Sequence, residues 1–183
     1  FLLNTGRYER AKTALQFALE LSERLNLRLQ VAVQTSNLAQ TASELGDDEA
    51  AATLYQRALA MIDSLDAKRW QSTIRSSYAQ WLTERGRSEE ARTVSAEALA
   101  LAEAAQDSEA MTRATIEAAR AATDTDAAGA AASLTPVINA LRTQNNRRLL
   151  ADALTVYSRA FAAKDKLDDA RKLWDEARKL YGL

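Results

Sequence analysis

Pairs of alanines seven residues apart recur along the chain, and each pair follows a short polar segment. Side chains seven positions apart lie on the same face of an α-helix, so each pair marks one helix. Small side chains on that face let neighbouring helices approach closely. The pairs are Ala11 and Ala18, Ala51 and Ala58, Ala91 and Ala98, and Ala170 and Ala177; Leu19, Leu59 and Leu99 follow three of them.

The polar segments share a second pattern, in which a glycine, a polar turn and an alanine five positions later follow one another. They begin at Gly6, Gly46 and Gly86, and a fourth segment begins at Asp165 without a glycine. Glycine enters the left-handed backbone region without a steric penalty, so we expect a turn after a helix at each position.

Acidic and hydroxyl residues follow these turns. We expect Ser88 with Glu89 and Glu90, and Asp168 with Asp169, to supply the cap and the acidic first turn of the next helix.

The unit is therefore a helix, a tight turn and a second helix, repeated about every 40 residues, as the spacing of Ala11, Ala51 and Ala91 shows. Abundant Ala, Leu, Arg, Glu and Gln favour long helices, and no strand pattern is evident. The expected class is all-α. The predicted helices are 9–25, 28–45, 48–64, 67–85, 88–105, 108–124, about 128–144, 147–163 and 167–181. The predicted units are approximately 1–26, 27–66, 67–106, 107–145 and 146–183.

The fourth unit is irregular. Matching Ala140 to the second alanine of a pair requires about two additional residues in the turn at 123–126. Pro136 then falls inside the following helix, where it removes a backbone donor and bends the helix. Alternatively, Thr135 caps a shorter helix that starts at Pro136. In both cases the stack should deviate locally.

The first residues, Phe1-Leu2-Leu3, are apolar, stop at Asn4-Thr5-Gly6 and have no basic leader, so they do not resemble a signal peptide. We expect them to be the end of a helix that begins outside this sequence. Residues 1–183 would then form a single repeat domain within a larger protein.

The composition restricts the function further. With 24 basic and 25 acidic residues, the net charge of -1 argues against direct nucleic-acid binding. Charges interrupt every apolar segment, so no membrane partner is expected. The absence of cysteine fits a cytoplasmic location. The absence of histidine removes the commonest general base and metal ligand, and no glycine-rich phosphate loop occurs. We therefore expect no enzyme activity, no catalytic residues, no cofactor and no metal site.

The residue pattern resembles tetratricopeptide repeats over nearly the whole chain. It is most specific in the second unit, where 36–39, 45–46 and 51–59 carry the pattern, and it resembles the long repeats of kinesin light chains and bacterial signalling regulators. Tyr78, Ala79, Leu82 and Gly86 continue it in the third unit, and Tyr157, Ser158 and Phe161 in the fifth. Agreement is weakest in the fourth unit, where Ala118, Ala119 and Ala122 occupy the bulky-small-bulky positions.

This resemblance implies a right-handed superhelical α-solenoid of antiparallel helix pairs. The first helix of each pair would line a concave groove that binds a peptide or a helix of a partner protein. The groove-facing positions would be Ser36, Asn37, Gln40, Glu44, Ser76, Ser77, Gln80, Glu84, Arg113, Glu117, Arg120, Asp152 and Arg159. Asn37 matches the family asparagine that holds a peptide backbone; the alternative is solvated helix surface.

The basic clamp by which co-chaperone members hold a terminal carboxylate is absent, because Thr73 and Ser77 stand at its positions. Arg113, Arg120 and Arg159 would receive an acidic segment if they converge. Alternatively, these arginines pair with nearby acids, for instance Arg120 with Glu117 or Asp124.

The tryptophans fall into two groups. The spacings around Trp81 and Trp174 indicate core packing between units, whereas Trp70 precedes the regular part of its helix and is a candidate anchor for a partner.

Three functions fit these observations. The first is a protein-protein interaction module that serves as a sensory or scaffolding part of a bacterial multidomain signalling protein. The second is a small-ligand-sensing domain of a transcription regulator or signalling ATPase, which a buried apolar pocket near the fourth unit would favour. The third is a scaffold that self-associates, because a solenoid that ends on an apolar face needs something to cover it.

Overall fold

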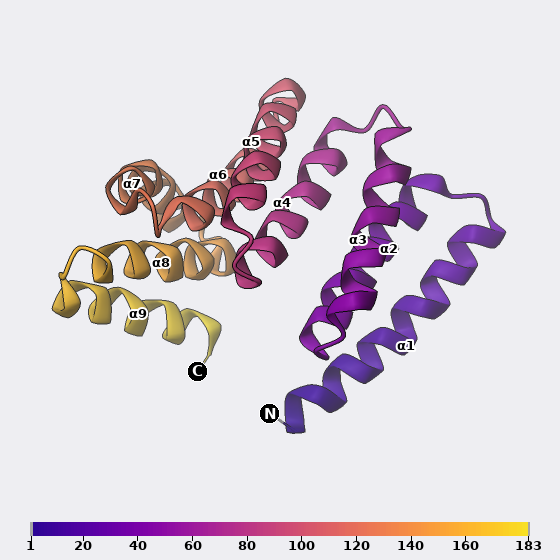
Figure 1. Ribbon diagram of the computed structural model, residues 1–183, viewed down its shortest axis with the longest axis horizontal. Helices are drawn as coiled ribbons and strands as arrows, with labels where there is room; N and C mark the ends of the chain where they lie inside the picture. The colour runs from indigo at the N-terminus through magenta and orange to yellow at the C-terminus, as the bar shows by residue number, and fades with distance from the viewer. Residues whose placement is uncertain (1, 183) are drawn as a thin grey trace.

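The structure, a computed structural model, describes the backbone of residues 2–182 and the side chains of residues 7–182. Figure 1 shows a curved stack of helices, with both ends of the chain on the same side of the view. The helices in the described part are α1 (Leu2–Arg24), α2 (Arg28–Glu44), α3 (Asp48–Asp63), α4 (Lys68–Glu84), α5 (Ser88–Ala105), α6 (Ser108–Ala122), α7 (Ala127–Gln144), α8 (Arg147–Ala162) and α9 (Leu167–Tyr181). No strand occurs between residues 2 and 182.

Four antiparallel pairs, α2–α3, α4–α5, α6–α7 and α8–α9, follow α1, and each helix packs against the next along the chain. The first helices of successive pairs also contact one another, α2 with α4, α4 with α6 and α6 with α8. This arrangement confirms the predicted all-α solenoid of antiparallel helix pairs.

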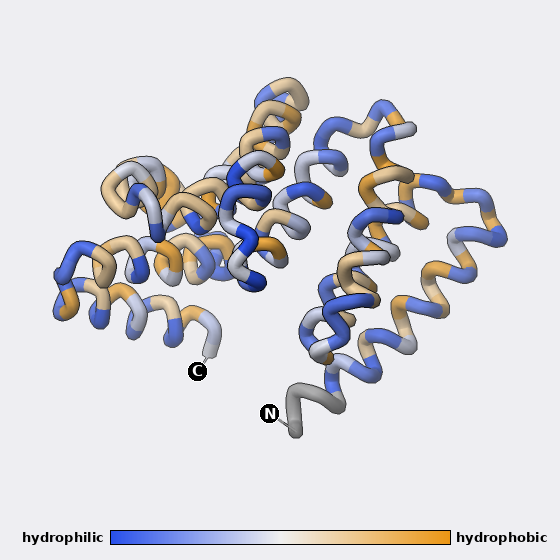
Figure 2. Tube along the Cα trace, in the orientation of Figure 1, coloured by the Kyte–Doolittle hydropathy of each residue, from blue (hydrophilic) through white to orange (hydrophobic). Residues whose placement is uncertain are grey.

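Three of the four predicted alanine pairs are buried in helix contacts, whereas Ala11 and Ala18 of α1 are only partly buried. Ala51, Ala58, Ala91 and Ala98 are fully buried, because small side chains at these positions let the helices approach. Figure 2 shows hydrophobic residues along one side of most helices and hydrophilic residues at the turns. Larger apolar side chains fill the remaining space, and Ile62, Leu82, Leu134 and Leu154 are fully buried.

The turns follow the predicted pattern at most units. Gly46 and Gly86 have φ of +83° and +73°, the left-handed conformation that only glycine adopts without strain. Asp165 takes the same conformation, with φ of 57°, at the position that lacks the glycine. Gln106 and Asn145 end α5 and α7 in the same way.

Gly6 does not form the predicted turn. Helix α1 runs without a break from Leu2 to Arg24, so the expectation that a separate helix ends before Gly6 is wrong for the backbone. An interior glycine costs a helix only about 1 kcal/mol relative to alanine, so α1 can continue through this position. Residue 1, and the side chains of residues 2 to 6, lie outside the described part.

The helix caps also differ in part. Glu89, Glu90, Asp168 and Asp169 lie in first turns as expected, but Ser88 is the first helical residue and makes no capping bond. The side-chain caps are at other helices: Asp47, Asp107, Asp126 and Asn146 each accept the backbone N–H three residues later, at 2.8 to 3.2 Å.

Helix α7 contains Pro136, and it continues from Ala127 to Gln144. The alternative in which a shorter helix begins at Pro136 is therefore wrong. The Thr135 hydroxyl donates to the carbonyl of Ala131 at 3.0 Å instead of capping. The turn before α7, residues 123–126, is one residue longer than those after α2 and α4, and α7 packs less closely on α6 than α5 does on α4.

Ion pairs connect second helices of neighbouring units on the outer side of the stack. Arg57 of α3 bonds Glu23 of α1 at 2.7 Å, and Arg142 of α7 bonds Glu176 of α9 at 3.0 Å. Both pairs join residues 34 positions apart.

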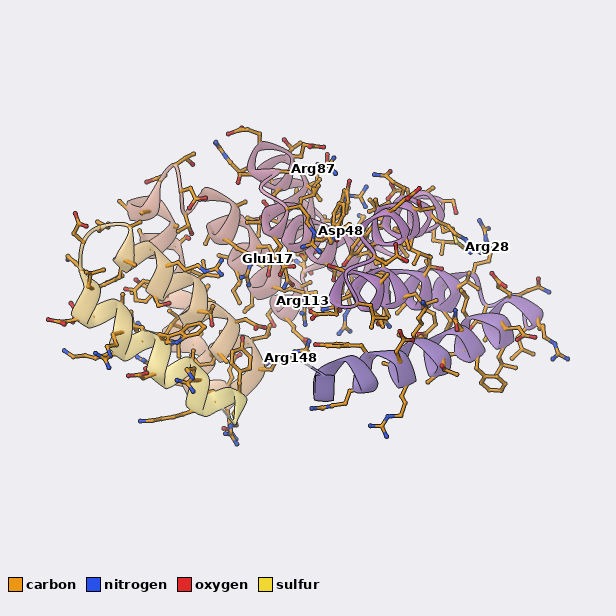
Figure 3. All side chains as sticks on the ribbon, turned by 60° about the horizontal axis from the view of Figure 1, so that its bottom comes forward. Arg28, Asp48, Arg87, Arg113, Glu117 and Arg148 are labelled. Atoms are coloured by element: carbon orange, nitrogen blue, oxygen red, sulfur yellow. The ribbon has the colours of Figure 1, made fainter. Side chains whose placement is uncertain are left out.

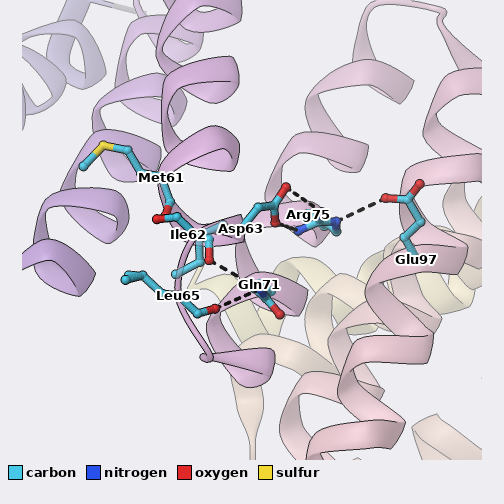
Figure 4. Close-up of polar contacts among 8 residues, drawn as sticks. Met61, Ile62, Asp63, Leu65, Gln71, Arg75 and Glu97 are labelled. Carbon is cyan, nitrogen blue, oxygen red and sulfur yellow. Dashed lines mark hydrogen bonds and ion pairs between the residues drawn. The ribbon is translucent and has the colours of Figure 1, made fainter.

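On α3 and α5, the positions equivalent to these ion-paired residues are both acids, Asp63 and Glu97. Arg75 of α4 lies between them, 2.8 Å from Asp63 and 3.2 Å from Glu97 (Figure 4). Nearby, the Gln71 amide donates to the carbonyls of Ile62 and Leu65 and so fastens the α3–α4 turn.

Candidate functional site

The four first helices converge on one polar cavity of about 90 Å³. Because the stack curves, side chains from α2 and α8, more than 100 positions apart in the sequence, line the same space. The lining residues are Gln40 of α2, Ser77 and Gln80 of α4, Arg113, Ile116 and Glu117 of α6, and Arg148, Leu149 and Asp152 of α8.

A smaller recess adjoins this cavity between α2, α3 and α4. Its lining residues are Gln40, Ser43, Glu44, Tyr55, Ser77, Gln80, Trp81 and Glu84. Gln40, Ser77 and Gln80 belong to both spaces, so the two form one continuous polar surface. The Gln80 amide donates to the Glu84 carboxylate at 2.9 Å, a pairing one helical turn apart that orients both side chains.

The structure brings together eight of the thirteen side chains that the sequence placed in the groove. They are Gln40, Glu44, Ser77, Gln80, Glu84, Arg113, Glu117 and Asp152. The other five lie elsewhere. Ser36 and Ser76 are buried between helices, and exposed Asn37 bonds Gln34 at 3.5 Å. Arg120 is held by an ion pair, and exposed Arg159 near the end of α8 lines neither space.

Glu117 and Arg120 form a buried ion pair on α6. Their side chains are 7% and 10% exposed, and Arg120 Nε donates to the Glu117 carboxylate at 2.8 Å. Burial raises the pKa of Glu117, and the positive charge of Arg120 opposes that rise. The pair confirms the alternative in which Arg120 binds a neighbouring acid, so this guanidinium is not free for a ligand.

Asp152 accepts a hydrogen bond from the Tyr181 hydroxyl at the end of α9. Burial, followed by this contact with the carboxylate, raises the pKa of Tyr181 to about 12. The bond joins the last helix to the cavity wall and fixes the position of Asp152. It also uses part of the acceptor capacity of this carboxylate.

Arg113 and Arg148 remain as the two available cations of the cavity. Arg113 has only a long contact with Glu109, at 3.5 Å, and no ion pair involves Arg148 among the described side chains. Figure 3 shows both arginines in the central part of the molecule, from α6 and α8. Arg148 was missed in the sequence, because its place in the first turn of α8, after the cap Asn146, resembles ordinary helix surface.

Trp70 lies beside this site. It is half-buried in a recess of about 160 Å³ that also includes Arg113, so the recess continues the polar cavity. The Arg69 guanidinium stacks over the Trp70 ring, 5.6 Å from the centroid. The role of Trp70 as an anchor for a partner stays a prediction.

The other two tryptophans differ from each other. Trp81 is 5% exposed and packs against Tyr55 and Tyr78, which confirms its predicted core position. Trp174 is 46% exposed, so its predicted core position is wrong. Leu173, Ala177 and Leu180 form the packed face of α9, and Trp174 lies at the edge of that face, where no further described helix covers it.

The site can form hydrogen bonds in both directions. The amides of Gln40 and Gln80 donate and accept, Ser77 has a hydroxyl, and Arg113 and Arg148 attract carboxylates. No group of acidic side chains suited to a metal ion occurs in the described part of the chain. None of the helices between residues 2 and 182 has the length and hydropathy of a membrane-spanning segment.

Comparisons with known proteins agree with this architecture. Residues 1–64 match the family described as tetratricopeptide repeat. No curated protein matches the sequence. A crystal structure of nearly identical TPR-like repeats from a Podosopora anserina kinesin light chain candidate has a TM-score of 0.64 and 14% identity, with 97% of this chain and 89% of that chain covered.

Two further solved structures are similar. A single-substitution variant of the same Podosopora anserina repeats has a TM-score of 0.66 and 14% identity, over 97% of this chain and 88% of that chain. BtubC (BKLC) from P. vanneervenii has a TM-score of 0.50 and 17% identity, over 96% and 91%. At these identities the likeness is one of fold.

Proposed function

We propose that this chain captures an extended segment of a partner protein in its concave cavity, because residues 1–64 match the tetratricopeptide repeat family and the fold is similar to that of kinesin light chain-like repeats. Repeats of this fold serve in general as protein-interaction or scaffold modules. The convergence of α2, α4, α6 and α8 on one polar cavity supports the proposal for this chain.

The chemistry of the cavity favours a peptide backbone over a compact ligand. An extended segment presents N–H and C=O groups in alternation, and the amides of Gln40 and Gln80 can satisfy both kinds. Small-molecule sites are larger, about 300 to 1,000 Å³, and mostly apolar, whereas this cavity is about 90 Å³ and polar. A ligand-sensing role therefore has less support from the site.

The free charges favour an acidic residue in the bound segment. Glu117 is neutralised by Arg120, and Asp152 is engaged by Tyr181, so Arg113 and Arg148 are the cavity charges left without a strong partner. A carboxylate between these two guanidinium groups would form charge-assisted hydrogen bonds. The segment could continue past Arg113 towards Trp70.

Selection from a random peptide display library on the intact 183-residue chain tests the proposal. The combined change Gln80→Ala and Arg148→Glu should weaken the selected peptides about tenfold or more, because it removes a hydrogen-bonding amide and reverses a charge. Fluorescence anisotropy measures the dissociation constants. The control combines Gln144→Ala and Arg147→Glu, which make the same chemical changes at exposed positions outside the cavity. Equal affinities for both variants would place binding elsewhere.

We further propose that the repeat domain, with its five approximate units, is a sensory or scaffolding part of a larger bacterial signalling protein. Its support is the resemblance to the repeats of bacterial regulators and the Ala- and Arg-rich composition. The gene sequence on either side of this segment decides the matter. A DNA-binding or nucleotide-binding domain next to it would support the proposal, and flanking sequence without such a domain would contradict it.

A further inference from the structure

The small recess between α2, α3 and α4 carries negative charge, whereas the free charges of the adjoining cavity are positive. Glu44 of α2 and Glu84 of α4 line this recess, and neither of them lines the cavity that holds Arg113 and Arg148. We name it the acidic recess. Its volume is about 10 Å³, which is room for one water-sized group.

The two acids stand at helix positions that disfavour them. Glu44 and Glu84 are equivalent residues, 40 positions apart, and each is the last residue of its helix. Unpaired carbonyl groups give the C-terminal end of a helix a partial negative charge, so a carboxylate there opposes helix stability. Neither α2 nor α4 has a basic residue in its last turn. Two equivalent acids at unfavourable places, facing one recess, indicate that their role is to bind a cation.

Arg85 follows Glu84 in the sequence, but it binds other groups. It donates to the Asp48 carboxylate at 2.8 Å and to the Ser43 hydroxyl at 2.9 Å. Its contact with Glu84 is long, at 3.8 Å, and Arg85 does not line the acidic recess. The charge of Arg85 is therefore balanced by Asp48, and that of Glu84 is left over.

Neutral groups hold the two carboxylates in place. The Gln80 amide donates to Glu84 at 2.9 Å, and the Tyr8 hydroxyl of α1 lies beside Glu44. Burial, followed by the charge of this carboxylate, raises the pKa of Tyr8. No ion pair involves Glu44 among the described side chains. An amide and a hydroxyl leave the charge of an acid unchanged, so the acidic recess keeps two negative charges.

Tyr55 gives an independent indication that a ligand enters the recess. It is the one α3 residue in the lining and is 1% exposed, and no hydrogen bond involves its hydroxyl among the described side chains. Burial raises the pKa of Tyr55, and the charges of Glu84, Glu117 and Glu44 raise it further, so its phenol oxygen lies near these acids. A buried hydroxyl normally has a partner, and a donor in the recess would provide one.

We propose that the acidic recess binds the ammonium group of a lysine in the captured segment, which then carries a lysine at the recess and an acid at Arg113 and Arg148. Gln40, Ser77 and Gln80 line both spaces, so they lie between the two charges of the segment. The inference rests on the proposed function for the segment, whereas the recess is tested without any segment.

The recess fits an ammonium better than other cationic groups. An ammonium is compact, has three N–H donors and stands on a flexible four-carbon stem. The carboxylates of Glu44 and Glu84 and the hydroxyl of Tyr55 are acceptors for these donors. The planar guanidinium of arginine is wider than a space of about 10 Å³ allows.

Nuclear magnetic resonance titration of the intact 183-residue chain with Nα-acetyl-lysine N-methylamide, at low salt, tests the recess directly. This blocked lysine should shift the amide signals of Gln40, Ser43 and Gln80, with a dissociation constant on the order of 10 mM. Blocked norleucine, which has the stem without the charge, should shift none of them. Blocked arginine should bind at least about threefold more weakly.

Glu44→Gln with Glu84→Gln should weaken binding of blocked lysine at least about fivefold, because both charges are removed. The melting temperature should stay the same or rise, because the two helix ends lose an unfavourable charge. The control combines Glu20→Gln and Glu103→Gln, exposed acids near the ends of α1 and α5 that do not line the recess, and should bind blocked lysine as wild type does. Equal binding of norleucine and lysine, or unchanged binding in the Glu44 and Glu84 variant, would overturn the proposal.

The peptides selected from the display library separate this inference from the proposed function. Replacing their lysine with alanine should weaken binding to wild type about tenfold, but should have little effect on the variant without the two acids. Peptides that depend on Gln80 and Arg148 but contain no lysine would overturn the lysine site and leave the proposed function standing. Binding of blocked lysine in the absence of any selected peptide would support the recess and contradict capture of a segment.

Discussion

Helices α4 and α6 are the first helices of consecutive units, yet they bury opposite kinds of side chain. Helix α4 carries Tyr78 and Trp81, whose rings stack 5.8 Å apart at an interplanar angle of 15° against the preceding unit. Helix α6 has Ala118 and Ala121 at the same positions. Accordingly, α6 packs closely along α5, whereas α4 touches α3 over a shorter length.

On their concave sides, α4 carries neutral side chains and α6 carries charged ones. Where α4 has neutral Ser77 and Gln80, α6 has the buried pair Glu117 and Arg120. One repeat pattern thus allows two kinds of joint. A joint filled with rings is stabilised by apolar burial and keeps the helices apart, whereas a joint of alanines brings them together and leaves a groove outside.

Trp81→Ala should cause the largest loss of stability among single changes at the α3–α4 joint, about 3 to 5 kcal/mol, because it leaves a cavity between Tyr55 and Tyr78. Urea denaturation followed by circular dichroism measures the change. Trp174→Ala is the matched control and should change stability by less than about 0.5 kcal/mol, since that ring is exposed. Equal losses would show that the joint does not depend on its rings.

Arg120→Met should destabilise α6 by about 3 to 5 kcal/mol, because Glu117 stays buried without its partner. The double variant Glu117→Leu and Arg120→Met should recover most of the loss. A double variant as unstable as the single one would contradict this account of the pair.

The loss has a characteristic pH dependence. The folded pKa of Glu117 is raised above its ordinary 4.5, so the native state holds a proton that the unfolded state releases. Stability should therefore fall as the pH rises from about 4.5 through the folded pKa, and the fall should be steeper in Arg120→Met. Urea denaturation at a series of pH values checks this sign.

Ala121→Leu should cost about 1 to 3 kcal/mol, because Ala121 is 1% exposed in the close contact of α6 with its neighbours. Ala118 lines the open hollow between α5 and α6, so there is room for a larger side chain there. Ala118→Leu should therefore change stability by less than about 0.5 kcal/mol. Thermal unfolding of the two variants compares them directly. If Ala118→Leu were the more damaging change, the hollow would be assigned to the wrong side of α6.

Asp48→Asn should change stability least of these variants, and it should alter how stability decreases at acidic pH. Asp48 of α3 bonds Arg85 of α4 at 2.5 Å across the ring-filled joint, and this hydrogen bond lowers the pKa of Asp48. A lowered pKa contributes stability above the ordinary 3.8 that is lost as the pH falls through the folded value. Wild type should therefore show a slightly larger drop than Asp48→Asn between neutral and acidic pH, in thermal melts. Identical pH profiles would show that the pair contributes nothing measurable.

The helices were predictable because their signals are local. Alanine spacing sets the buried face, and glycine at positions 46 and 86 ends the helices. The caps at Asp47 and Asp107 are equally local. Each is an acid directly before a predicted helix, where its carboxylate can accept the backbone N–H three residues later. The pairing of Arg120 with Glu117 was foreseen as an alternative, since it spans less than one helical turn.

The cavity was only partly predictable, because its walls depend on how far the stack curves. Ser36 and Asn37 are adjacent, yet Ser36 is buried and Asn37 is exposed to solvent. Which of the two faces the cavity depends on how α2 is rotated about its own axis, and the spacing of apolar residues does not determine that rotation. Arg148 joins the site only because α8 returns to face α2. Trp174 occupies the position of the buried Tyr55, and its exposure depends on whether another helix packs over α9, which is not a local property.

The ion pairs on the outer side specify the order of the repeats. Between α1 and α3 the facing residues are the acid Glu23 and the base Arg57, and between α7 and α9 they are the base Arg142 and the acid Glu176. Between α3 and α5 both facing residues are acids, and Arg75 of α4 lies between them. Each exposed pair contributes at most about 1 kcal/mol to stability. Their selectivity is greater: a chain with the second and third units exchanged would set Glu23 against Glu97, two like charges. Charge therefore disfavours a wrong order of repeats that have nearly the same shape.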